Sequence, residues 1–136
     1  MEQSLLQQVW QRANSTCEYC RMPQQYDLLT FQVDHIIARK HHGTDELGNL
    51  ALACYACNNH KGPNIAGLDS EMGAVVRLFH PRQDLWRDHF RWQDTVLAGR
   101  TSIGRVTIDV LAINLPHRLR LRQMLILEGV FPPPPS

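Results

Sequence analysis

Two Cys-x-x-Cys pairs constrain this chain of 136 residues more than any other feature of its sequence. Cys17 and Cys20 form the first pair, Cys54 and Cys57 form the second, and 33 residues separate the pairs. Two residues between cysteines allow a tight turn that points both thiolates at one ion, and four thiolates suit a tetrahedral structural zinc. The pattern therefore predicts a structural Zn²⁺ that ties the ends of the intervening segment together. Two redox dithiols, or four unligated core cysteines, are the alternatives.

The composition is typical of a cytosolic globular protein, in which paired cysteines more often hold a metal than form disulfides. Hydrophobic residues make up 43% of the chain and charged residues 20%, so a core can form without disulfide support. The N-terminus lacks the basic and apolar segments of a secretion signal. No segment has the roughly 18 apolar residues of a membrane span. We expect a cytoplasmic protein that makes no contact with a membrane.

The net charge of +1 conceals an asymmetry between the two parts of the chain. Residues 1–76 carry 5 Lys/Arg and 8 Asp/Glu, whereas residues 77–136 carry 9 arginines and 5 Asp/Glu. An Arg-rich part beside a metal site suits an enzyme that binds phosphate groups. Ordinary variation of a protein surface is the alternative explanation for the same totals.

The segment between the cysteine pairs predicts the order strand, loop, strand, helix. In chain order these are a strand over 28–33, a loop over 38–48, a second strand over 49–53 and a helix over 54–61, which Gly62 and Pro63 end. The first strand delivers Asp34 and His35 at its end. Neighbouring side chains on a regular strand point to opposite faces, so these two can share one site only if the strand bends there.

The flanking parts predict further elements around this segment. We expect a helix over 4–13 with Ser4 as its N-cap, a loop over 63–70, a strand within 72–79, a helix over 103–114 capped by Thr101 or Ser102, and a helix over 116–128 that ends at Gly129. A Pro-rich tail over 131–136 should be extended or disordered. The chain then divides into a core (1–66), a C-terminal extension packed on it (67–130) and the tail (131–136).

An aromatic group in the extension is interleaved with arginines. The apolar members are Leu85, Trp86, Phe90 and Trp92, and the basic members are Arg82, Arg87 and Arg91. We interpret the group as part of the core with a solvated face. A surface that stacks bases and binds phosphates is the alternative.

Four pieces of the sequence resemble the HNH endonuclease family, in its four-cysteine zinc subtype and its stand-alone bacterial form. They are Cys17-Glu-Tyr-Cys20, Val33-Asp34-His35-Ile36-Ile37, the stretch from Gly43 to Asn49-Leu50, and Cys54-x-x-Cys57-Asn58-x-x-Lys61-Gly62. They cover about residues 15–62, and the three positions of the family name fall on His35, Asn49 and Asn58. The last is a departure, Asn for His. The resemblance implies an α+β fold, with a zinc-stabilised ββα-metal core, an N-terminal helix and a mainly helical C-terminal extension.

The resemblance also implies a divalent-metal-dependent endonuclease that hydrolyses DNA phosphodiester bonds. His35 would be the general base that takes a proton from water, and Asn49 would bridge the loop and help to orient His35. Asp34 and Asn58 would hold Mg²⁺ or Mn²⁺, since both side chains offer the oxygen ligands that hard cations prefer.

Nucleic acid, most of all double-stranded DNA, is the partner that this resemblance implies, and a homodimer would allow both strands to be cut. We expect Arg39, Lys40, His60 and Lys61 to contact the nucleic acid, with plain solvent exposure as the alternative. Two other functions stay open, a non-catalytic zinc-knuckle module that binds nucleic acid and an RNase with the same centre. A pure binding module has no need of a general base and metal ligands, which favours the nuclease.

Overall fold

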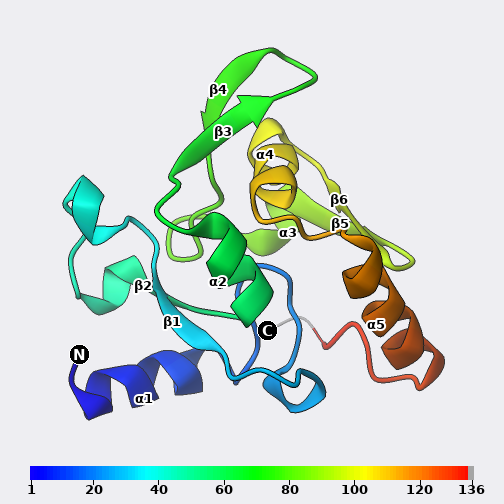
Figure 1. Cartoon of the computed structure of the whole chain (residues 1–136), viewed down its shortest axis with the longest axis horizontal. Coiled ribbons are helices and arrows are strands. Elements are labelled where there is room, and N and C mark those ends of the chain that lie inside the picture. The colour runs from blue at the N-terminus through cyan, green and yellow to red at the C-terminus, as the bar shows by residue number, and fades with distance from the viewer. Residues whose placement is uncertain (135–136) are drawn as a thin grey trace.

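The computed structural model describes residues 1–134, in which helices alternate with short antiparallel strands (Figure 1). The elements are α1 (Gln3–Arg12), β1 (Gln32–His35), β2 (Leu50–Ala53), α2 (Tyr55–Lys61), β3 (Ala66–Asp69), β4 (Ala74–Arg77), α3 (Trp86–His89), β5 (Phe90–Gln93), β6 (Val96–Gly99), α4 (Ser102–Val110) and α5 (Pro116–Leu127). Single 3₁₀ turns lie at Gln24–Tyr26, Arg39–His41 and Leu47–Asn49. Within residues 1–134, no helix is long and apolar enough to cross a bilayer.

The antiparallel pair β1–β2 and the helix α2 form a ββα unit at the centre of the molecule. In the register of the pair, Gln32 lies opposite Ala53 and His35 lies opposite Leu50. All four residues of β2 are completely buried, as expected for a continuous apolar run in a strand. The helix α1 packs against β2 and α2 packs against β1. The site described below is therefore built on β1, a strand whose partner β2 runs through the core.

The second strand and α2 confirm the prediction within one residue, but β1 lies further along the chain than predicted. It begins at Gln32, and Leu28 is fully exposed. The Gln24 side chain accepts a hydrogen bond from the Phe31 backbone N–H and donates one to the Leu29 carbonyl. Side chains that take up backbone groups in this way compete with strand pairing. Consequently Asp34 and His35 belong to β1, and its register with β2 continues through His35 without the predicted bend.

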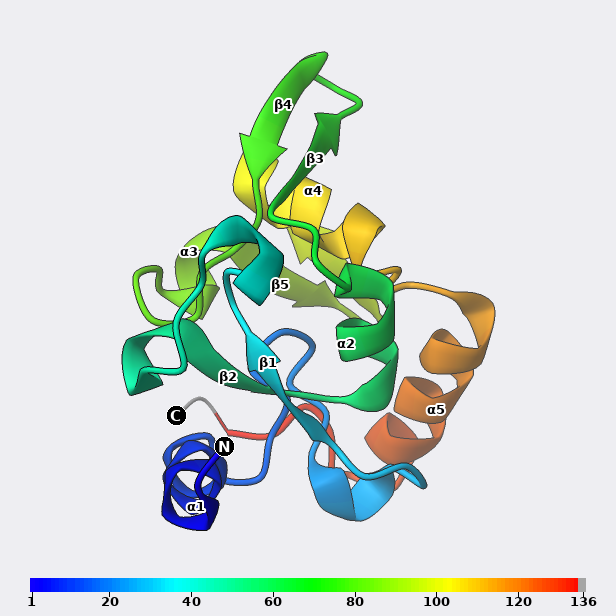
Figure 2. The same ribbon diagram turned by 60° about the vertical axis from the view of Figure 1, so that its left-hand side comes forward.

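Two β-hairpins and α4 make up the first part of the extension. The helix α4 packs against β3, β4 and β6, and Figure 2 shows the β3–β4 hairpin projecting from the rest of the molecule. The strand predicted within 72–79 is present as β4, whereas the predicted loop over 63–70 contains β3. Close packing explains Gly104 in α4, because a Cβ there would lie 2.0 Å from the carbonyl oxygen of His89.

The helices largely follow the sequence, with differences at their ends. Thr101 caps α4 by accepting a hydrogen bond from the Gly104 N–H, and α4 ends at Val110, four residues before the predicted end. Helix α5 begins with Pro116 at its first position and is followed by Gly129 at φ +75°, as expected. The predicted N-cap Ser4 is wrong, because α1 begins one residue before it.

The C-terminal segment turns back towards the core after α5 (Figures 1 and 2). Phe131 is 5% exposed, and its ring centroid lies 5.1 Å from that of Trp92. Of the two predicted forms of the tail, extended or disordered, burial of Phe131 excludes disorder at the first residue, since a buried aromatic anchors the segment. Residues 135–136 of the predicted tail lie outside the described residues.

Candidate active site

The four cysteines converge on one point in the core. Their Sγ atoms all lie within 4.8 Å of one another, and all four residues are buried. The Sγ atoms of Cys20 and Cys54 are 3.7 Å apart, close to the edge of about 3.8 Å that a tetrahedron with Zn–S bonds of about 2.3 Å would have. In each pair the backbone N–H of the second cysteine points at the sulfur of the first, at 3.5 Å for Cys17 and 3.4 Å for Cys54. The cluster therefore fits a tetrahedral metal such as zinc.

Arg118 of α5 lies directly against this cluster, a contact that the sequence did not predict. Its Nη2 donates to the Cys57 Sγ at 3.1 Å, and its Nη1 donates to the Leu111 carbonyl at 3.0 Å. Burial alone would lower the pKa of Arg118, but the nearby thiolates raise it above its usual range. Four thiolates around one Zn²⁺ leave two negative charges, and the guanidinium offsets one of them. The extension is thus joined to the metal centre by a charged contact.

Asp34 of β1 is buried in an ion pair with Lys61, the last residue of α2. The carboxylate accepts a hydrogen bond from the Tyr19 hydroxyl at 2.8 Å, and the Lys61 Nζ lies 3.3 Å and 3.2 Å from its two oxygens. Lys61 also donates to the His35 carbonyl at 3.0 Å. Burial raises the pKa of Asp34, and the opposite effects of Lys61 and Tyr19 are smaller. The ion pair fixes the end of α2 to β1.

This ion pair bears on two predictions from the sequence. Lys61 is 1% exposed, so the predicted contact between its ammonium group and nucleic acid is wrong for the side chain as it lies. Asn58 is half-buried one turn before Lys61, and Asp34 already has the positive charge of Lys61 beside both oxygens. The predicted pair of Asp34 and Asn58 therefore does not fit Mg²⁺ or Mn²⁺ in this arrangement, because a second cation would be repelled by Lys61.

His35, the predicted general base, is oriented by Asp45, which the sequence analysis missed. The His35 Nε2 and the Asp45 Oδ1 are 2.7 Å apart, and the His35 side chain is 18% exposed. Arg39 donates three hydrogen bonds to the same carboxylate, at 3.0–3.2 Å. The hydrogen bonds from His35 and Arg39 lower the pKa of Asp45. A carboxylate accepts, so Nε2 carries the hydrogen of this bond, and Nδ1 is the acceptor in the neutral imidazole.

Asn49 and Gly43 fix the loop that brings Asp45 to His35. The Asn49 side chain accepts from the Ile37 N–H at 2.9 Å and donates to the carbonyls of Ile37 at 3.0 Å and Thr44 at 2.8 Å. A Cβ on Gly43 would lie 1.6 Å from the Ile37 carbonyl oxygen. Only glycine therefore permits the close approach of the two ends of this loop.

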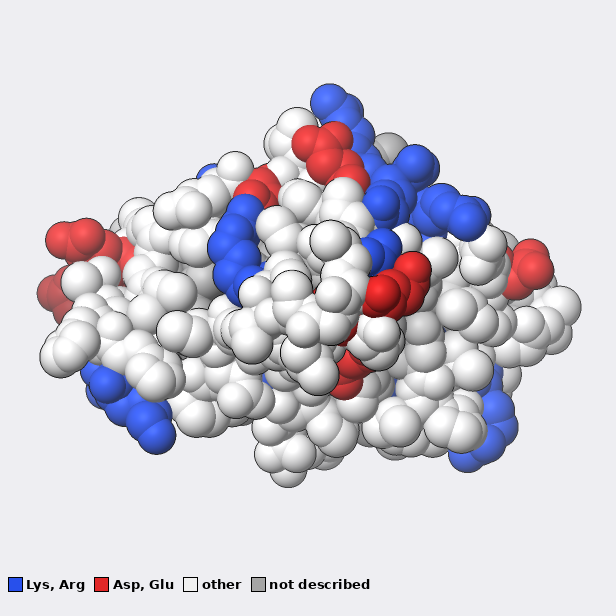
Figure 3. Space-filling view, turned by 90° about the horizontal axis from the view of Figure 1, so that it is seen from above, with Lys and Arg blue, Asp and Glu red and all other residues white. Residues whose placement is uncertain are grey.

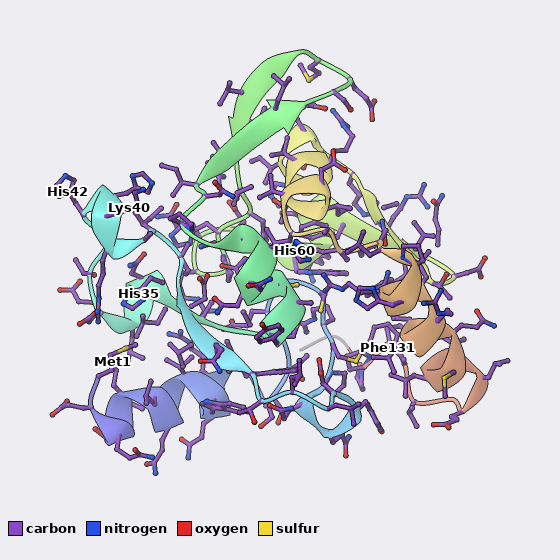
Figure 4. All side chains as sticks on the ribbon, in the orientation of Figure 1. Met1, His35, Lys40, His42, His60 and Phe131 are labelled. Atoms are coloured by element: carbon purple, nitrogen blue, oxygen red, sulfur yellow. The ribbon has the colours of Figure 1, made fainter. Side chains whose placement is uncertain are left out.

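The remaining basic residues occupy two different places. Figure 4 shows Lys40 and His42 at the turn that follows β1, and both are exposed. Arg39, predicted to contact phosphates, is paired with Asp45 instead. His60 is exposed on α2 and lines a cavity together with His117 of α5, away from the loop that carries Lys40 (Figure 4).

Comparison with known proteins agrees with this geometry. Residues 17–64 match the family model of the HNH endonuclease. The matched segment holds all four cysteines, His35, Asp45, Asn49 and Asn58. The HNH match confirms the expected family resemblance, and with the cysteine cluster it confirms an α+β fold of the zinc subtype.

Most of the chain is similar to one curated protein. Septu protein PtuB from Bacillus thuringiensis is 27% identical over 116 residues, which are 84% of this chain and 42% of PtuB. The chain thus spans about two fifths of the length of this curated relative. No solved structure matches the chain significantly.

We expect purified protein to contain one zinc per chain, measured by inductively coupled plasma mass spectrometry, and to unfold when a strong chelator removes it. Binding of zinc to structural four-ligand sites contributes about 10–16 kcal/mol in small domains.

Arg118→Met should weaken zinc binding about 10- to 100-fold in a chelator competition assay, as loss of a partner beside metal ligands typically does.

Arg120→Met is the matched control, because Arg120 is exposed on the same helix. It should bind zinc as tightly as the unchanged protein. Equal zinc affinities of the two variants would show that the guanidinium of Arg118 does not support the metal centre.

Gly43→Ala should lower the melting temperature by about 3–12 °C, since overpacking costs about 1–3 kcal/mol. The physical cause is the collision with the Ile37 carbonyl. Gly48→Ala is the control, because a Cβ there meets nothing within 4 Å. Circular dichroism melts of both variants would test this, and equal melting temperatures would contradict the proposed close approach.

Proposed function

We propose that this protein is an endonuclease that hydrolyses phosphodiester bonds of double-stranded DNA, with His35 as the general base. The observation that carries the proposal is the His35–Asp45 pair inside an HNH domain. The side chain of His35 is partly exposed, which supports access of water to its imidazole. We also propose zinc as the metal of the cysteine cluster, in a cytoplasmic protein whose compartment keeps the thiols reduced.

The proton transfer follows from the tautomer that Asp45 selects. Nε2–H donates to Asp45, and Nδ1 accepts a proton from the attacking water. The imidazole becomes positively charged as it does so, and the adjacent carboxylate stabilises that charge. Arg39 helps to hold Asp45 in place, with its Nη2 3.0 Å from the same Oδ1. Asn49 affects the His35–Asp45 pair indirectly, by holding the loop that carries Asp45.

A divalent ion would supply charge neutralisation at the phosphate and at the leaving oxygen. The family resemblance implies Mg²⁺ or Mn²⁺ at Asp34 and Asn58, but the Lys61 ammonium lies against the Asp34 carboxylate. The chemistry above is therefore assigned to His35 and its partners alone. Comparison of the metals in the assay below tests whether the activity needs such an ion.

We propose that a few exposed basic residues, and not a continuous basic surface, contact the substrate. Lys40 and His42 are exposed at the 3₁₀ turn that follows β1 (Figure 4), and the face seen in Figure 3 carries separate groups of Lys and Arg with no continuous basic surface. A net charge of +1 agrees with this distribution. A homodimer would place two centres on one duplex. An RNase with the same centre, and a zinc module that binds nucleic acid without cutting it, are the alternative functions.

Supercoiled plasmid incubated with the purified protein and Mg²⁺ or Mn²⁺ should be nicked or linearised, and His35→Ala should lower the rate about 10²- to 10⁴-fold. The variant should retain its zinc, which separates loss of the base from loss of the fold. Undiminished cutting by His35→Ala would disprove the role of His35. A zinc-loaded protein that shifts DNA in a gel but cuts neither DNA nor RNA with any metal would establish the binding module.

Asp45→Ala should lower kcat about tenfold or more with little change in KM, because the imidazole loses the partner that sets its tautomer. Asp45→Asn should restore part of kcat, since its side-chain oxygen still accepts from Nε2–H. Glu46→Ala is the matched control, being an exposed acid one residue further along the loop. A kcat for Asp45→Ala equal to that of the control would exclude Asp45 as a positioning residue.

A further inference from the structure

A second cavity, of about 580 Å³, lies between the end of α1, the first cysteine knuckle and the segment that includes α3. Neither His35 nor Asp45 lines it. Its volume falls within the range of about 300–1,000 Å³ that is usual for pockets that bind small molecules. Four arginines and two tryptophans form much of its wall: Arg12, Arg21, Arg82, Arg87, Trp86 and Trp92. The nuclease chemistry uses none of these residues.

The charge of this cavity is positive and only partly compensated. Glu18 and Asp84 are its acidic residues, and Asp84 is already held by two hydrogen bonds from Arg77, at 2.8 Å and 2.9 Å. Glu18 pairs with Arg82, whose Nε is nevertheless buried without a hydrogen-bond partner among the described residues. Burial, and then the charge of Arg12, lower the pKa of Arg82 to about 10. Crowded guanidinium groups of this kind favour a bound anion.

Arg87 is the arginine most available to a ligand. It lies on α3, it is exposed, and it has no hydrogen-bond or ion-pair partner within residues 1–134. Arg12, in contrast, donates to the carbonyls of Leu47 and Leu50. Arg87 can therefore be changed without removing a contact that supports the fold.

The aromatic part of the wall argues for more than a simple anion. The ring centroids of Trp86 and Trp92 are 6.0 Å apart, and the guanidinium carbon of Arg21 lies 5.8 Å from the Trp86 centroid. The Trp86 Nε1–H donates to the Tyr19 carbonyl at 2.8 Å, which fixes the ring. Tryptophan and arginine side by side are the groups on which nucleobases stack, while arginines bind the attached phosphate.

We propose that this cavity binds a nucleoside phosphate, with the phosphate held by the arginines and the base against the two tryptophans. The ligand is either a free nucleotide or a single nucleotide of an unpaired strand, since both present the same chemistry. Trp86 and Trp92 are packed against the core but only partly buried. The interleaved aromatic and arginine residues therefore contribute both to the core and to the wall of the cavity. The site does not depend on the nuclease activity, so either proposal can fail alone.

Isothermal titration calorimetry would compare inorganic phosphate, AMP, ADP and a short oligo-dT, without added divalent metal so that no strand is cut. We expect AMP or ADP, the oligo-dT, or both, to bind more tightly than phosphate. Arg87→Gln should weaken that binding about tenfold, the usual effect of losing one charged hydrogen bond. Arg120→Gln, a change of an exposed arginine outside the cavity, should leave it unchanged.

The indole N–H signals of the three tryptophans provide a readout that is independent of affinity. Signals of Trp86 and Trp92 should shift with ligand, whereas Trp10, which packs on Phe31 at 6.3 Å, should not. Preference for the mononucleotide or for the oligonucleotide would identify the source of the ligand. Phosphate that binds as well as the nucleotides, no binding at all, or equal affinities of the Arg87 and Arg120 variants would each overturn the proposal.

Discussion

The four-thiolate cluster is the contact on which the rest of the molecule depends. It joins the first knuckle to the start of α2 and so holds together the ends of the strand-loop-strand segment that carries His35. Through Arg118 it also holds α5, so the extension shares the centre that stabilises the core. Two negative charges in a buried position would be unfavourable without such a partner. Charge balance at the metal thus explains why a helix from the far end of the chain packs there.

The second buried charge, on Asp34, is balanced within the protein. Lys61 and Tyr19 satisfy the carboxylate, and Lys61 reaches the His35 carbonyl as well. Removing one partner of a buried ion pair is strongly destabilising, which ties the geometry of β1 to the end of α2. His35 and Asp34 therefore have different surroundings, although they are adjacent in sequence. His35 is held by the exposed loop, and Asp34 by the core.

The sequence was informative where one local signal dominates. The continuous apolar run of β2, the glycine after α2 and the cysteine spacing all predicted structure that is present. The start of β1 was not predictable from alternation, because Gln24 binds the backbone that would have extended the strand. Asp45 was missed because its role depends on the path of the loop. Arg118 and Arg122 are buried four residues apart, while Arg120 between them is exposed, a distinction that only the packing of α5 reveals.

The long span of these contacts has a consequence for the order of folding. Cys57 and Arg118 are 61 residues apart, and Tyr19 and Trp86 are 67 residues apart. Contacts between residues far apart in the chain form slowly, because a long loop must close first. All four cysteines leave the ribosome long before α5 does, so the cysteine cluster can assemble while the extension is still being made. A cluster formed in this order would offer α5 a preformed docking surface, reached through Arg118.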